Sequence, residues 1–158
     1  MTVAHETRIG TLYLEASEVG LTLLGFSPPE VPGPRSEAGD RVVAAAQAEI
    51  DAYLDGTLRT FTVPVDLSGT SAAHRRVLEG LDPVGWGETI TYGELATAVG
   101  LPLSDSRRVG GAMARNPVAI VVPCHRVIGS DGSLTGYAGG LDRKRTLLDL
   151  ETVGQRLF

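Results

Sequence analysis

The beginning of the chain alternates apolar and polar positions in a way that predicts antiparallel strands. Residues 6–26, ETRIGTLYLEASEVGLTLLGF, alternate on both sides of turn-type residues at 17–20, which is typical of a β-hairpin. The next stretch, residues 27–40, contains four prolines. Because proline lacks a backbone donor and resists helix formation, we expect an exposed connection there.

Helical spacing replaces the alternation after this connection. Apolar residues recur near helical spacing from Val43 to Leu54, with Asp40 as the expected N-cap and Gly56 as the expected stop. Residues 61–65, FTVPV, predict a short strand, which its proline restricts to a sheet edge. The first part of the chain therefore predicts a small α/β unit.

The second part of the chain is predicted to be mainly helical. Its pattern predicts helices at 71–81, 91–99 and 104–115, and the last two are joined by the short GLPL segment. Such a pair has the outline of a helix-turn-helix. Gly110 and Gly111 each cost about 1 kcal/mol of helix stability relative to alanine. We therefore expect a close approach to that backbone, either by another helix or by a nucleic-acid groove.

The chain ends with a glycine-rich loop and one more helix. Glycines between residues 129 and 140 predict a hairpin-like loop, and the leucines that follow predict an amphipathic helix ending near Glu151. Together these patterns predict an α+β protein of two domains. We place an N-terminal α/β domain at residues 1–68 and a mainly helical C-terminal domain, which contains the helix-turn-helix outline, at residues 69–158.

Composition narrows the class of protein. A single cysteine, Cys124, cannot form an internal disulfide, and His5, His74 and His125 are too scattered for a metal site, so we expect no metal and no cofactor. The start of the chain lacks the apolar segment of a signal peptide, and the longest aliphatic run, residues 119–122, is too short to span a bilayer. These features predict a soluble cytoplasmic protein with no membrane partner.

The charge is distributed unevenly along the chain. The net charge is −5, but residues 1–70 carry four arginines against ten acidic residues, whereas residues 71–158 carry ten Lys/Arg against nine. Contacts with a polyanion therefore belong to the second part. The alternative explanation for its basic residues is a solvated helix face. The strongest local basic content lies at four arginines: Arg107, Arg108, Arg115 and Arg126.

The stretch IVVPCHRVIG places the only thiol beside an imidazole. A cysteine after an apolar strand is often a small buried hydrophobic residue. Here Pro123 restricts the backbone entering Cys124, and His125 follows directly, so a bridging water is better placed than a direct bond to relay the proton. A nucleophilic thiol needs a base and a group that orients the base. Glu151 is the best candidate for orienting His125, and the alternatives are Asp131, Asp142 and Asp149.

Residues 116–151, NPVAIVVPCHRVIGSDGSLTGYAGGLDRKRTLLDLE, closely resemble the active-site signature of the O6-alkylguanine-DNA alkyltransferases, which repair O6-methylguanine in DNA. The Pro-Cys-His-Arg-Val core, with Asn-Pro before it and Gly-Tyr-x-Gly-Gly-Leu after it, is more specific than a Cys-His pair. GETITYGELA and RVGGAM extend the resemblance to roughly residues 66–153. It implies a ribonuclease H-like N-terminal domain and a winged-helix-like C-terminal domain.

The resemblance also implies roles for matching residues. Cys124 matches the acceptor thiolate, which takes the alkyl group in one irreversible transfer, and His125 matches a base that acts through water. Glu151 matches the carboxylate partner of that histidine. Tyr92 matches the tyrosine that meets N3 of the flipped guanine, and Asn116 matches the asparagine that ties the recognition helix to the active-site segment.

The resemblance further implies duplex DNA with an alkylated guanine as the partner of a monomeric protein, bound through the minor groove. Arg107 matches the arginine that fills the stack after base extrusion, and Arg108 is expected to meet phosphate. The carbonyl of Val127, together with that of Cys124, would accept from the guanine amino group. The remaining residues expected at the pocket or the DNA are Gly110, Ala112, Arg126, Tyr137 and Ala138.

Departures from the family pattern leave other functions open. Residues 71–86 and 101–108 are atypical, Ala138 replaces a common serine, and the zinc ligands of some relatives are absent. One alternative function is recognition of alkylated bases without transfer. Another is a thiol hydrolase or redox sensor. Repair of O4-methylthymine is a further activity that the resemblance leaves open.

Overall fold

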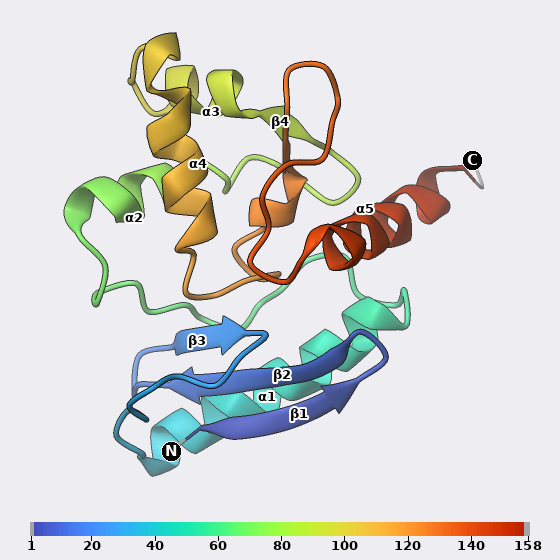
Figure 1. Ribbon diagram of the computed structural model, residues 1–158. Helices are drawn as coiled ribbons and strands as arrows, with labels where there is room; N and C mark the ends of the chain where they lie inside the picture. Colours follow the sequence, from blue (N-terminus) through green and yellow to red (C-terminus); the bar gives the residue numbers. More distant parts are fainter. Residues whose placement is uncertain (1, 157–158) are drawn as a thin grey trace. The chain divides into compact units, whose positions relative to one another are not determined.

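The computed structural model describes residues 2–156, with side chains described through residue 152. The chain divides after Gly69 into two compact units, which are described separately below. The first unit is a small sheet with one helix, and the second is mainly helical (Figure 1).

The first unit contains a three-stranded antiparallel sheet in the order β1-β2-β3. Strand β1 (Val3–Thr7) pairs with β2 (Gly10–Ala16), and β2 pairs with β3 (Leu21–Gly25). The turn predicted at 17–20 is present, because the Ser17 amide donates to the Gly20 carbonyl at 2.9 Å. The predicted hairpin is therefore extended by one strand, β1.

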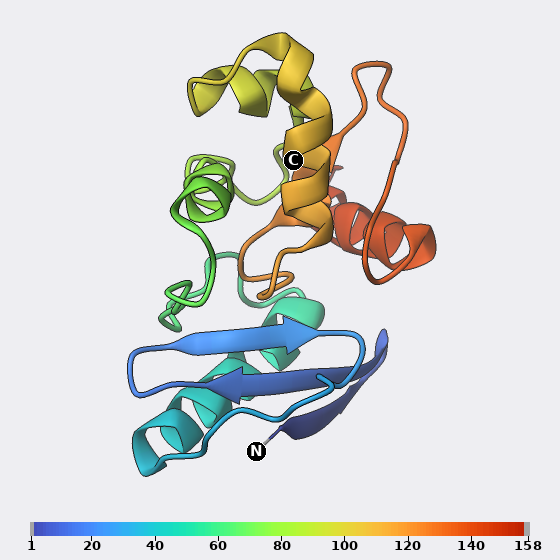
Figure 2. The ribbon, with the colours of Figure 1, turned by 60° about the vertical axis from the view of Figure 1, so that its left-hand side comes forward.

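One helix covers one face of this sheet, as both views show (Figures 1 and 2). Helix α1 (Glu37–Leu54) begins earlier than expected, because the Ser36 hydroxyl, and not Asp40, accepts the capping bond from the Gly39 amide. Gly56 follows the helix with φ of 81°, as expected of a stop residue. The prediction of a strand at 61–65 is wrong, because this segment forms only an isolated bridge, between Val65 and Leu21.

Through residue 156, the second unit contains four α-helices. Each of the predicted ones is present with shifted ends: α2 (Ala72–Glu79), α3 (Tyr92–Ala98), α4 (Ser106–Ala114) and α5 (Leu141–Arg156). A 3-10 turn, η1 (Leu103–Asp105), leads into α4. Thr91 and Glu94 form a capping box that sets the start of α3. Helix α5 continues beyond Glu151, where the sequence predicted its end.

A short parallel pairing positions the site. Strand β4 (Ile90–Thr91) pairs with β5 (Val127–Ile128), with Ile90 opposite Val127. Strand β4 leads directly into α3, and β5 begins directly after the 3-10 turn η2 (Cys124–Arg126). This pairing therefore brings Tyr92, the first residue of α3, close to the turn that carries the thiol. Within the described residues, no helix is long and apolar enough to cross a membrane.

Candidate active site

The segment before the thiol is a compact turn. The apolar run before Cys124 has the composition of a strand, but it forms a turn: the Val122 amide donates to the Val118 carbonyl at 3.0 Å, and the Cys124 amide to the Val122 carbonyl at 2.8 Å. Ile120 has φ of 71°, which is strained for a β-branched side chain, and it is only 1% exposed. Burial of the apolar side chains in this turn compensates for the unfavourable backbone.

Cys124 opens the 3-10 turn η2 and is 5% exposed. Burial raises the pKa of its thiol, while a hydrogen bond from Asn116 and the positive charge of Lys144 oppose that rise. Asn116 also donates to the Val122 carbonyl at 2.8 Å, and its side-chain oxygen accepts from the Val118 amide at 3.0 Å. This asparagine, two residues after α4, thus fixes the segment that presents the thiol.

His125 and Glu151 form a buried pair. The imidazole Nε2 donates to the Glu151 carboxylate at 2.8 Å, and the two side chains are 0% and 1% exposed. Burial lowers the pKa of His125, although Glu151 opposes the shift, so the ring is neutral near pH 7. With the proton on Nε2, Nδ1 is the nitrogen that can accept one. Nδ1 is buried without a hydrogen-bond partner among the described residues.

Arg126 corrects an expectation, because its side chain faces inward. The guanidinium donates to both carboxylate oxygens of Glu151 at 2.9 and 3.0 Å and to the Val84 carbonyl at 2.7 Å. Burial alone would raise the pKa of Glu151, but hydrogen bonds from His125 and Arg126 outweigh it and lower the pKa to about 2. Since the guanidinium is engaged inside the protein, Arg126 holds Glu151 and is not a DNA-facing residue.

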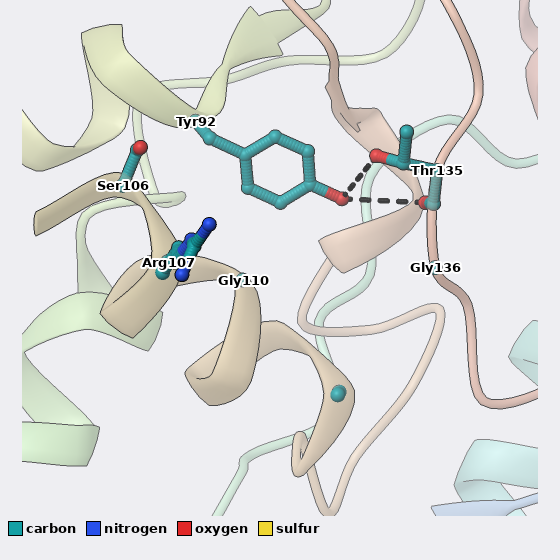
Figure 3. Close-up of a pocket in the computed structure, with 7 residues that line it drawn as sticks. Tyr92, Ser106, Arg107, Gly110, Thr135 and Gly136 are labelled. Carbon is teal, nitrogen blue, oxygen red and sulfur yellow. Dashed lines mark hydrogen bonds between the residues drawn. The ribbon is translucent and has the colours of Figure 1, made fainter.

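A pocket of about 400 Å³ opens beside the start of α4 (Figure 3). Across it, the Tyr92 hydroxyl donates to the Thr135 carbonyl at 3.3 Å, and the Thr135 hydroxyl donates to the Tyr92 oxygen at 3.1 Å. Arg107 is exposed on the α4 side of this pocket. Its lining contains Tyr92, Ser106, Arg107, Gly110, Ala114, Thr135 and Gly136.

Helix α4 presents only some of its small residues to this pocket. Gly110 lines it, and a Cβ added there would lie 3.8 Å from the Tyr92 ring. Ala112 corrects an expectation, because it is 3% exposed and its carbonyl accepts from His74 of α2 at 2.9 Å. Ala112 therefore belongs to the packing of α2 on α4. Arg108 is exposed and lies 3.6 Å from Asp105.

Three other residues predicted at the pocket, Val127, Tyr137 and Ala138, follow the thiol in the chain but do not line this pocket. The Tyr137 hydroxyl oxygen is buried, and burial, together with the nearby Cys124, raises the pKa of Tyr137 well above its usual value. Ala138 is exposed, and Val127 is fully buried in β5. Sequence reasoning missed Thr135, Ser106 and Lys144. A threonine in a glycine-rich loop and a lysine in an amphipathic helix carry no local signal that marks them as residues of the site.

No cluster of His, Cys, Asp or Glu that could hold a metal ion is found among residues 2–156. The side chains of the site supply a thiol, a neutral imidazole held by a carboxylate, and a tyrosine hydroxyl.

Comparisons with known proteins agree with this architecture. Residues 72–153 match the family model described as 6-O-methylguanine DNA methyltransferase, DNA binding domain. The methylated-DNA–protein-cysteine methyltransferase of Methanosarcina acetivorans is 43% identical over 92% of this chain and 94% of its own length. That of Mycolicibacterium paratuberculosis is 52% identical over 70% of this chain, and the match spans 66% of that relative.

Solved structures show the same fold. Mycobacterium tuberculosis OGT in complex with DNA aligns with a TM-score of 0.83 and 39% identity, over 95% of this chain and 91% of that one. The O6-methylguanine-DNA methyltransferase of Pyrococcus kodakaraensis aligns with a TM-score of 0.64 and 26% identity, over 96% of this chain and 99% of that one. The chain therefore belongs to the 6-O-methylguanine DNA methyltransferase family, and its fold is the mixed α/β fold of these proteins.

Proposed function

We propose that this protein repairs DNA by transferring the alkyl group of O6-alkylguanine in duplex DNA to Cys124. The observation that carries the proposal is the buried arrangement of thiol, imidazole and carboxylate in the unit that also bears the exposed Arg107. Relatives named as methylated-DNA–protein-cysteine methyltransferases and a relative solved with DNA support it.

The reaction begins with activation of the thiol. The Cys124 proton passes through a water molecule to Nδ1 of His125, whose Nε2 is already held by Glu151. The imidazolium formed in this way is stabilised by the carboxylate. Because burial raises the pKa of Cys124, this proton transfer is what makes the sulfur a nucleophile near neutral pH.

The thiolate then displaces guanine from the alkyl carbon. A carbon–sulfur bond forms as the bond between that carbon and O6 breaks, and its electron pair moves onto the purine. The Tyr92 hydroxyl donates to N3 and stabilises the developing charge, and guanine finally takes up the proton that the thiol released. The thioether on Cys124 has no route for release, so each molecule reacts once.

Access to O6 requires that the nucleotide leave the duplex. We propose α3 and α4 as the helix-turn-helix, with α4 in the minor groove, where Gly110 permits close approach and Arg107 fills the vacated stack. The ribonuclease H-like description of the first unit and the winged-helix-like description of the second belong to the same proposal.

The test is the intact mass of the protein after incubation with a duplex that contains one O6-methylguanine. We expect a gain of one methyl group, saturating at one per protein and located on Cys124 by peptide mapping. The same duplex with unmodified guanine is the control for the DNA, and Cys124→Ser, which keeps a similar shape, is the control for the protein. Lesion binding by the unaltered protein with no mass change would show recognition without repair and overturn the proposal.

A further inference from the structure

Lys144 is a buried cation to which the proposed mechanism gives no role. It is the only lysine in the sequence, since the other 13 of the 14 basic residues are arginines. It lies in the first turns of α5 and is 0% exposed. Burial of an ammonium group is costly unless it is paired and hydrogen-bonded, so its surroundings show what the charge does.

The Lys144 ammonium connects the active-site turn to the wall of the pocket. Its Nζ donates to the Val127 carbonyl at 2.6 Å and to the Thr135 carbonyl at 2.8 Å. The Val127 amide in turn donates to the Cys124 carbonyl, closing the turn that carries the thiol. The Thr135 carbonyl also accepts from Tyr92, whose ring centroid lies 5.9 Å from Nζ. The short distances are typical of a charged donor.

We propose that Lys144 is a positioning residue for the acceptor thiol: it holds the carbonyls of Val127 and Thr135 in place and supplies the buried positive charge that stabilises the Cys124 thiolate. The inference deepens the proposed function and rests on Cys124 as the acceptor. Val127 has a second lone pair, so its carbonyl can accept from a guanine amino group while Lys144 fixes its direction.

The charges around the thiol make Lys144 the natural counter-ion. His125 is neutral near pH 7, and the positive charge of Arg126 is paired with Glu151. The Tyr137 hydroxyl, on the loop beside the thiol, stays neutral at that pH. The Lys144 ammonium donates to two neutral carbonyls and forms no ion pair among the described residues, so its charge there is uncompensated until the thiolate forms. Lys144 and Cys124 therefore favour each other's charged forms.

The first experiment measures alkylation of Cys124 by iodoacetamide against pH, which needs no DNA. Lys144→Met removes the charge and both hydrogen bonds, and Lys144→Gln keeps a shorter, uncharged NH2 group as donor. We expect both variants to react about tenfold more slowly near neutral pH, because loss of the positive charge raises the thiol pKa. The rate should recover in alkaline solution. Arg145→Met, a charge loss at the exposed neighbour, is the matched control and should leave the profile unchanged.

Wild-type pH profiles in both Lys144 variants would overturn the inference. If the Lys144 variants were alkylated more slowly, as expected, but the unaltered protein transferred no methyl group, the result would count against the proposed function alone. Single-turnover transfer from O6-methylguanine adds the geometric readout: Lys144→Met should be slower than Lys144→Gln at equal lesion affinity, because only the amide can still hold one carbonyl.

The single lysine also permits a test that does not depend on how these variants fold. Labelling with lysine enriched in ¹³C at Cε gives one side-chain signal, whose pH titration reports Lys144 directly. Since coupling between two sites is reciprocal, the thiolate must raise the lysine pKa as the lysine lowers that of the thiol. We expect Cys124→Ser to lower the Lys144 pKa measurably. An unchanged titration would show that the two groups do not interact and would overturn the inference.

Discussion

Replacement of Glu151 by glutamine tests the buried network most directly. The carboxylate accepts from His125 and twice from Arg126, and its pKa falls from 4.5 to about 2. That difference corresponds to about 3 kcal/mol of stability at neutral pH. In Glu151→Gln the buried guanidinium also loses its partner, and breaking a buried pair in this way costs roughly 3–5 kcal/mol. We therefore expect the free energy of unfolding of Glu151→Gln to be lower than that of the wild type by roughly 3–5 kcal/mol.

The pH dependence of this loss follows from the direction of the shift. A carboxylate whose pKa is lowered by folding contributes its stability above the unfolded pKa of 4.5, and this contribution is lost as the pH falls towards about 2. The difference between wild type and Glu151→Gln should therefore be constant above about pH 5 and disappear in stronger acid.

Urea unfolding followed by Trp86 fluorescence measures the effect, since this is the only tryptophan in the chain and it lies in the second unit. Asp149→Asn, an exposed charge loss on the same helix, is the control. Adding Arg126→Met to Glu151→Gln should restore part of the lost stability, because the unpaired charge is then removed. A Glu151→Gln variant within about 1 kcal/mol of wild type at pH 7 would refute a buried, paired carboxylate.

Three further predictions concern the side of the second unit that we propose to face DNA. Arg107→Ala should slow methyl transfer from duplex DNA more than from the free alkylguanine base, and equal losses in single-turnover assays would remove its role in extrusion. Tyr92→Phe should retain lesion binding but lower the transfer rate by roughly 10²-fold, as loss of one donor to a developing charge does. An unchanged rate would exclude that donor. Gly110→Ala should raise helix stability by about 1 kcal/mol, because the added Cβ meets only the Tyr92 ring at 3.8 Å. It should weaken DNA binding in titrations, and wild-type affinity would show that DNA does not approach this backbone.

Local sequence signals were sufficient for the helices of the second unit and for the turn in the sheet. Ser71 caps α2, and Thr91 with Glu94 caps α3, because a hydroxyl or carboxylate within three residues satisfies the free backbone donors. The same local logic misplaced the start of α1 at Asp40, whereas the helix is capped earlier by the Ser36 hydroxyl.

The apolar run before the thiol shows where local signals fail. Residues 118–122 have strand composition, yet the chain turns there and places Ile120 at positive φ. A strand needs a partner to satisfy its backbone groups. The local turn satisfies several of them with its own hydrogen bonds, while Asn116 binds both Val118 and Val122. Which of the two arrangements is more stable depends on contacts distant in sequence.

The sequence by itself determined the chemistry of this protein: one thiol next to a histidine, a glutamate on the final helix, and a helix pair that carries arginines. Only the tertiary structure decided which charged groups face the solvent. Arg107 is exposed, whereas Arg126 and Lys144 are buried and hold Glu151 and two backbone carbonyls. The physical reason is that the cost of burying a charge depends on partners that only folding brings together, here a carboxylate 25 residues away and a carbonyl 17 residues away.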